Sequence, residues 1–119
     1  AQTAQRVITA EREIAIFAYV RRRLAFLIAD EAQFNAIEGL GYKDFLGKLT
    51  VYYDAPAKGR LFDFIEGVDG YDKFIFPEPF GEIVTNNIYE IDEALRATFV
   101  SRVRELGAAG LTQRLARIA

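Results

Sequence analysis

The first clear pattern along the chain is a helical spacing of apolar residues from about residue 10 into the upper twenties. This spacing is typical of an amphipathic helix, whose apolar residues lie on one side. The apolar stripe consists of Ile14, Phe17, Val20, Leu24, Leu27 and Ile28. Thr9 is a candidate N-cap, and Glu11 and Glu13 follow in the first turn, where carboxylates favour the positive helix end. Residues 1–8 have no strong pattern and are interpreted as a linker or a lead-in strand.

The pattern then changes from a helical period to an alternation of apolar and polar residues. Before the change, Asp30 predicts the N-terminus of a short helix over residues 31–38, with Gln33 completing the capping box. After it, aromatic and β-branched residues with Gly and Pro between them predict an antiparallel meander. The three predicted strands cover residues 49–53, 61–65 and 73–76.

The last third of the chain returns to a helical period. Asn87 with Glu90 three residues later is a capping pattern for a long helix. The apolar stripe of this helix consists of Ile88, Ile91, Leu95, Phe99, Val103 and Leu106. Gly107 stands where a C-cap glycine is expected, and residues 108–119 are interpreted as a separate short amphipathic helix.

Together these elements predict an α+β fold with two layers. A three-stranded antiparallel meander packs against two long helices, in the order α-β-β-β-α with short extra helices. Residues 9–107 would form the single domain, a size that suits the 119 residues of the chain.

Composition agrees with a globular domain, because 51% of the residues are hydrophobic and 27% are charged. No apolar run approaches the roughly 18 residues of a membrane span. No basic segment followed by an apolar stretch marks a signal peptide at the N-terminus. We therefore expect a cytoplasmic protein with no membrane partner.

Charge is distributed unevenly along the chain. Residues 1–29 carry five Arg and two Glu, residues 30–93 carry five basic and fourteen acidic residues, and residues 94–119 carry five Arg and one Glu. Basic flanks therefore enclose an acidic middle, which bears on partners and association rather than on fold.

The chain contains neither His nor Cys, which excludes Ser-His-Asp and Cys-His catalytic arrangements. The single serine, Ser101, is expected to be an exposed residue in mid-helix. Some carboxylates near the predicted sheet are candidates for acid–base work, with the polar face of a half-buried sheet as the alternative. They are Asp44, Asp54, Asp63 and Glu66.

Metal and phosphate sites are equally poorly supported. Asp63, Asp69 and Asp72 could supply oxygen ligands, but D-G-Y-D does not match a calcium loop and is better interpreted as a tight turn with solvated carboxylates. No Gly-rich phosphate loop is present. The sequence thus predicts that the protein binds no cofactor and no metal and that it is not an enzyme.

Nucleic-acid binding is the more open possibility. Arg21, Arg22 and Arg23 span nearly a full helical turn, so that at least two face solvent, either to contact phosphates or as a solvated helix face. The other candidate DNA contacts are Lys48, Lys58 and Arg60. Four aromatic residues form either a stacking platform for bases or part of the core. The negative charge of residues 30–93 would repel phosphates and therefore favours the interpretation as core residues. The four aromatic residues are Tyr52, Tyr53, Phe62 and Phe64.

Four short sequence motifs resemble those of a known family. They are RVITAEREI (6–14), YKD (42–44), RLF (60–62) and NNIYEID (86–92). Over about residues 6–105 the chain resembles the module found C-terminal to the nuclease domain in prokaryotic proteins related to the N-terminal nuclease part of type I restriction enzymes. The resemblance implies a longer parent protein with a PD-(D/E)xK-type nuclease fold upstream, a prophage or host-defence protein that acts on DNA.

The resemblance assigns no catalytic role to any residue of this chain. The positions that match the family's motifs are Thr9, Asp44, Arg60, Leu61, Ile88 and Tyr89. The turn APAKG (55–59) departs from the more polar turn of the family, which weakens phosphate binding there. No acidic residue stands two positions before any lysine, so the [DE]-x-K motif of a metal-dependent nuclease is missing from these residues.

The leading hypothesis is a non-catalytic accessory domain that positions duplex DNA or docks on the upstream nuclease domain of the same polypeptide. The alternative is a self-association module, a homo-oligomer in which basic terminal helices meet the acidic sheet region of a neighbour. Four residues are interpreted as structural or interaction residues: Asp44, Tyr52, Phe62 and Tyr89. The role of Asp44 and Arg60 has two open interpretations. They form a structural ion pair, or they make a functional contact.

Overall fold

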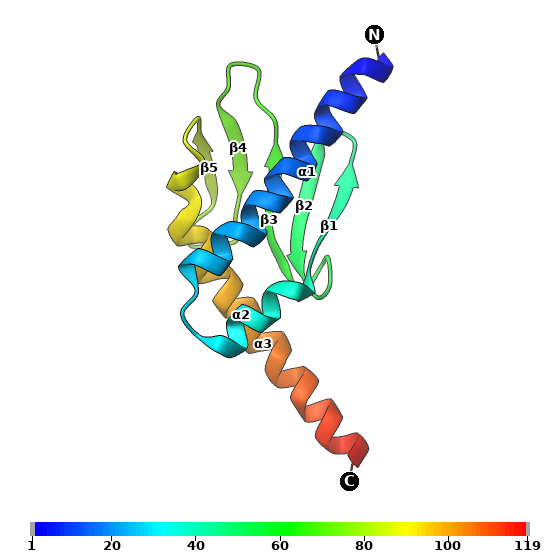
Figure 1. Cartoon of the computed structure of the whole chain (residues 1–119), viewed down its shortest axis with the longest axis vertical. Helices are drawn as coiled ribbons and strands as arrows, with labels where there is room; N and C mark the ends of the chain where they lie inside the picture. The colour runs from blue at the N-terminus through cyan, green and yellow to red at the C-terminus, as the bar shows by residue number, and fades with distance from the viewer. Residues whose placement is uncertain (1, 119) are drawn as a thin grey trace.

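Two long helices and a five-stranded sheet make up most of the chain (Figure 1). The computed structural model describes the backbone of residues 2–118 and the side chains of residues 11–106. In chain order the elements are α1 (Gln2–Leu27), α2 (Glu31–Ala36), the 3-10 turn η1 (Ile37–Gly39), β1 (Leu40–Phe45), β2 (Lys48–Tyr53), β3 (Arg60–Ile65), β4 (Asp72–Ile75), β5 (Glu82–Thr85), the 3-10 turn η2 (Ile88–Ile91) and α3 (Asp92–Ile118). In the described part of the chain, no helix combines the length and the apolar character that a membrane crossing needs.

The sheet is an antiparallel meander in which the strands follow one another in the order β1-β2-β3-β4-β5. The predicted α+β class is confirmed, and the three predicted strands correspond to β2, β3 and β4. The prediction of only three strands is wrong, because β1 and β5 add one strand at each edge. Four of the six β1 residues are exposed and β5 has only four residues, so neither edge strand shows a clear alternation.

One face of the sheet carries the hydrophobic core. The strand register places Leu49 beside Phe64, Phe64 beside Phe74, and Val51 beside Phe62, and none of these side chains is more than 1% exposed. The buried side chains that cover this face from the long helices include Val20, Leu24, Leu95 and Phe99. Each fully buried side chain of this size contributes about 1.5–3 kcal/mol. Phe62 and Phe64 therefore pack in the core, and neither is available to stack on bases.

A β-bulge in β3 determines which way Arg60 points. Val51 pairs with Phe62, but Tyr52 pairs with Arg60, so Leu61 is an extra residue on the β3 side. Strict alternation along β3, with Leu61 as a regular strand residue, would put Arg60 on the core face with Phe62 and Phe64. The bulge places Arg60 beside Tyr52, on the sheet face that points away from the core.

Both long helices extend further than the sequence predicts. α1 begins at Gln2, so residues 2–8 are helical rather than a lead-in strand, and the helix does not begin after Thr9. α3 continues through Gly107 to Ile118 without a break, so the predicted C-cap and separate last helix are not formed. A glycine within a helix costs only about 1 kcal/mol, which the surrounding helix formers offset. The side chains of the predicted stripe in residues 108–119 lie outside the described residues.

The two predicted capping residues of the interior elements are confirmed. The Asp30 side chain accepts a hydrogen bond of 2.9 Å from the backbone N–H of Gln33 at the start of α2. Asn87 accepts one of 3.2 Å from the N–H of Tyr89 and so caps η2, which leads directly into α3. These caps fix where the chain enters α2 and α3.

Candidate functional site

The three consecutive arginines of α1 do not share one role. Arg23 donates from Nε to both carboxylate oxygens of Asp92, at 3.1 and 3.2 Å, and thereby ties α1 to the first residue of α3. Its guanidinium also lies 4.8 Å from the ring centroids of Phe26 and Tyr89. The hydrogen bonds that Arg23 donates to Asp92 raise the pKa of Arg23 above its ordinary value. Arg23 is therefore a structural residue, and Tyr89 is part of the same contact.

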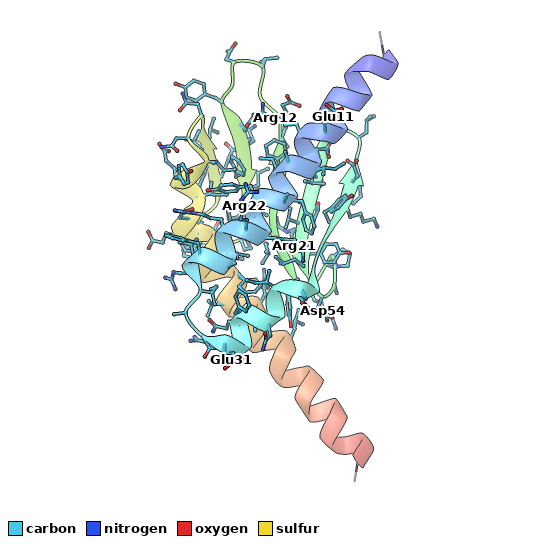
Figure 2. The ribbon with its side chains drawn as sticks, in the orientation of Figure 1. Glu11, Arg12, Arg21, Arg22, Glu31 and Asp54 are labelled. Atoms are coloured by element: carbon cyan, nitrogen blue, oxygen red, sulfur yellow. The ribbon has the colours of Figure 1, made fainter. Side chains whose placement is uncertain are left out.

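Arg21 and Arg22 instead line a groove between α1 and the α2–η1 segment. The groove has a volume of about 460 Å³. Its lining residues are Ala18, Arg21, Arg22, Ala25, Phe34, Asn35, Ile37 and Glu38. Figure 2 labels Arg21 and Arg22 on the part of α1 that approaches α2. Within residues 11–106, the ion pairs of the structure include neither arginine. Their guanidinium groups are thus available to an anionic ligand.

The apolar part of the groove is accessible as well. The Phe34 side chain is 50% exposed, although it is a large aromatic residue. The small side chains of Ala18 and Ala25 leave room beside it on the α1 wall. The groove therefore combines two free cations with an open apolar floor, and Glu38 adds one carboxylate at its border.

The remaining basic candidates lie elsewhere on the molecule. Arg60 and Lys48 point from the sheet face opposite the helices, and both pair with Asp63, at 3.4 and 3.9 Å. Asp63 also accepts a hydrogen bond of 2.6 Å from the hydroxyl of Thr50. Lys58 is exposed in the turn before β3. The six predicted DNA contacts are therefore spread over two faces and a turn, and they do not form a continuous basic surface.

Asp44 does not pair with Arg60, because the two lie on opposite faces of the sheet. Asp44 pairs with Leu49 in the register and so faces the helices, where it meets Glu13 of α1. Glu13 is only 6% exposed, and its Oε2 has no hydrogen-bond partner. Burial, together with the Asp44 carboxyl group, raises the pKa of Glu13 to about 7. Near neutral pH, Glu13 is therefore protonated in about half of the molecules.

A second acidic residue under α1 has a structural role. Asp72 is buried and bonds to Arg12, and it accepts a hydrogen bond of 3.0 Å from the N–H of Gly67. Arg12 also lies 3.6 Å from Glu66. The D-G-Y-D turn thus ends in a buried carboxylate that anchors it to α1, rather than in solvated carboxylates. Within the described residues, no group of three or more acidic side chains could hold a metal ion.

Two further candidates have ordinary surroundings. Ser101 is exposed on α3, and its hydroxyl lies 3.4 Å from a Glu105 carboxylate oxygen. Tyr52 lies over Gly41 of β1, so close that a Cβ at that glycine would come within 2.7 Å of the tyrosine hydroxyl. Tyr52 is thus part of the packing between β1 and β2, on the face away from the core.

The sequence pointed to one wall of the groove but not to the other. Arg21 and Arg22 were visible as part of an arginine run, whereas Phe34, Asn35 and Ile37 carry no motif. Glu13 was assigned only to the first turn of its helix, because nothing in the sequence indicates that a residue 31 positions away would face it.

Comparison of the chain with protein-family models, with curated proteins and with solved structures finds no match to any of them. The resemblance to restriction-enzyme accessory modules therefore rests on the four short motifs alone and stays a prediction.

Proposed function

We propose that this chain is a non-catalytic binding domain that docks an acidic, partly apolar segment of a partner protein in the groove between α1 and α2. The observation that carries the proposal is the juxtaposition of Arg21 and Arg22 with the open apolar surface of Phe34. Arginine and aromatic residues are the types that contribute most to binding at protein interfaces. An amphipathic segment with carboxylates beside an apolar anchor complements both features.

A protein segment fits this groove better than a phosphate backbone does. The exposed apolar surface of Phe34 gains nothing from phosphates but can be covered by an apolar side chain of a peptide, whereas Glu38 repels phosphates and carboxylates alike. An apolar side chain of a partner would cover Phe34, while its carboxylates would reach the two guanidinium groups as charge-assisted hydrogen bonds. In the accessory-domain hypothesis, the partner segment belongs to a nuclease domain of the same polypeptide.

Duplex DNA is the second candidate, because Arg21 and Arg22 have no acidic partner within the described residues. The two candidates differ in salt dependence. Binding to duplex DNA weakens steeply between roughly 50 and 200 mM salt, in proportion to the number of phosphates contacted. Binding that depends on an apolar anchor retains much of its strength over this range, since salt does not screen apolar burial.

The experiment is fluorescence anisotropy of the full chain with two labelled probes. One probe is an acidic amphipathic peptide with leucine and phenylalanine at helical spacing, and the other is a duplex oligonucleotide. The variant Arg21→Gln/Arg22→Gln should weaken peptide binding by about tenfold or more. The matched control Arg104→Gln changes an exposed arginine outside the groove and should leave binding unchanged. Loss of duplex binding in the double variant, with no peptide binding by the native chain, would overturn the peptide proposal in favour of DNA.

A further inference from the structure

A second apolar surface borders the groove near the C-terminal end of α1. Phe26 of α1 and Tyr89 of η2 are 76% and 58% exposed. The guanidinium of Arg23 lies 4.8 Å from the centroid of each ring and so connects the two. We call Phe26, Arg23 and Tyr89 the aromatic patch. Exposed apolar residues that gather in this way, rather than being scattered singly, mark an interaction site.

Polar contacts hold the aromatic patch in place, although its rings are exposed. Arg23 donates to both carboxylate oxygens of Asp92, the first residue of α3. The backbone N–H of Tyr89 donates to the side chain of Asn87. A surface that is ordered before binding loses less conformational entropy when a partner covers it. The patch is therefore a suitable anchor point for a partner.

Arg22 joins the aromatic patch to the groove. It lines the groove, and it precedes Phe26 by four residues, so the two side chains are neighbours on the surface of α1. Ala25, which also lines the groove, directly precedes Phe26. From Ala18 to Phe26, this surface extends over about 12 Å of α1. The groove and the patch thus form one continuous surface with the cation of Arg22 between its two apolar parts.

The groove by itself offers a partner little aromatic contact. An aromatic side chain has roughly 150–250 Å² of surface, so the half-exposed Phe34 provides about 100 Å². Phe26 and Tyr89 raise the exposed aromatic surface to roughly 350 Å² on the same scale. A partner that covers both apolar parts therefore gains much more from apolar burial than one that covers the groove alone.

We propose that the partner segment is an acidic amphipathic helix that also covers the aromatic patch, with two apolar anchors and carboxylates between them. One anchor covers Phe34, the other covers Phe26 and Tyr89, and the carboxylates reach Arg21 and Arg22. The α1 part of this surface, about 12 Å long, matches about eight residues of a helix. This inference rests on the proposed function, to which it adds the second anchor and the length of the segment.

A tryptophan probe tests whether the partner covers the patch, because the chain has no tryptophan of its own. Phe26→Trp places the probe in the patch. The control Phe45→Trp places it on the sheet face away from the core, where Phe45 is 43% exposed. The acidic amphipathic peptide should shift the emission of Phe26→Trp to shorter wavelength, because the second anchor excludes water from the ring. The emission of Phe45→Trp should not shift.

Truncation of Phe26 measures how much the second anchor contributes. In fluorescence anisotropy, Phe26→Ala should bind the labelled peptide about tenfold more weakly than the native chain does. The matched control Phe45→Ala removes an exposed ring outside the surface and should bind as the native chain does. Circular dichroism verifies that each variant is folded.

The outcomes separate the second anchor from the proposed function. If Arg21→Gln/Arg22→Gln loses the peptide but Phe26→Ala binds it as the native chain does, or the Phe26→Trp emission does not shift, the second anchor is overturned alone. A native chain that does not bind the peptide would overturn both. An emission shift of Phe26→Trp caused only by the duplex oligonucleotide would assign the patch to DNA. A shift caused by protein concentration alone would assign it to a second copy, and either result would overturn the inference.

Discussion

At the scale of single residues, three consecutive arginines on one helix have two different environments. Arg23 bonds to Asp92 and lies 4.8 Å from the centroids of two aromatic rings, whereas Arg21 and Arg22 line the groove. Helical geometry causes the difference, because successive residues point about 100° apart around the axis. Only one of the three directions meets the start of α3.

The arginine run therefore predicts unequal effects on stability. Arg23→Gln removes the contact that links α1 to α3, so thermal unfolding should occur at a lower temperature than in the native chain. Arg21→Gln and Arg22→Gln remove exposed groups and should leave the melting temperature nearly unchanged. Calorimetry of the three variants provides the comparison, and equal melting temperatures would contradict the assigned role of Arg23.

Glu13 makes stability depend on pH. Its pKa is about 7 in the folded chain against an ordinary 4.5, so the folded chain keeps this proton to higher pH than the unfolded chain does. The folded chain is therefore most stable at low pH, and it loses about 3 kcal/mol of its free energy of unfolding as the pH rises from about 4.5 to 7. Urea unfolding at pH 5, 6, 7 and 8 measures this loss.

Substitution of Glu13 isolates the cause of this pH dependence. Glu13→Gln should flatten the profile and stabilise the chain at pH 8, because the amide stays neutral and can donate to Asp44. The control Glu11→Gln changes an exposed carboxylate of the same helix and should keep the native slope. An unchanged slope in Glu13→Gln would assign the pH dependence to other groups.

At the scale of elements, the strands that bury one face were predictable and the edge strands were not. β2, β3 and β4 are rich in aromatic and β-branched residues, because each of these strands pairs on both sides and contributes buried residues to the core. β1 and β5 each pair on one side only and are largely exposed, so packing imposes little pattern on them. The sequence also contains no local signal for the bulge at Leu61. This bulge places Arg60 on the sheet face opposite to the one that strict alternation predicts.

The cap of α2 links local structure to the groove. Asp30→Ala removes the side-chain acceptor of the Gln33 N–H and should lower the free energy of unfolding by about 1 kcal/mol. Because α2 supplies Phe34 and Asn35 to the groove, the same variant should also weaken the binding of the acidic peptide. Unfolding in urea and anisotropy measure the two effects. An Asp30→Asn variant retains an acceptor and should behave as the native chain, and loss of binding in both variants would argue against a capping role.

The docking of α3 depends on its buried residues. Phe99 is fully buried, and its ring meets that of Tyr53 edge-on at 5.9 Å. Phe99→Ala should lower the free energy of unfolding by about 3–5 kcal/mol, because it leaves a cavity between α3 and β2. Arg104→Ala, an exposed change on the same helix, should cost less than about 0.5 kcal/mol. Equal effects in urea unfolding would contradict the packing of α3 on the sheet.

At the scale of the whole molecule, the core lies between the helices and one sheet face, which leaves the groove between α1 and α2 and the other sheet face open to solvent. The groove between α1 and α2 is cationic and apolar, whereas the sheet face away from the core mixes apolar side chains with charged pairs such as Lys48–Asp63 and Lys73–Glu82. The uneven charge along the sequence suggested association, which stays a hypothesis, and the fold pairs most cations of the acidic middle with Asp63 and Glu82.

The most direct test of the binding proposal is a titration of the full chain, labelled with ¹⁵N, with the acidic amphipathic peptide, followed by ¹H–¹⁵N correlation spectra. We expect the largest shifts at the backbone amides of Ala18, Ala25 and Asn35, which line the groove, and none at those of Lys43 or Val84 on the open face. The Arg21→Gln/Arg22→Gln variant should show much smaller shifts at the same peptide concentration. Shifts confined to the open sheet face, or no shifts in the native chain, would contradict the proposed docking site.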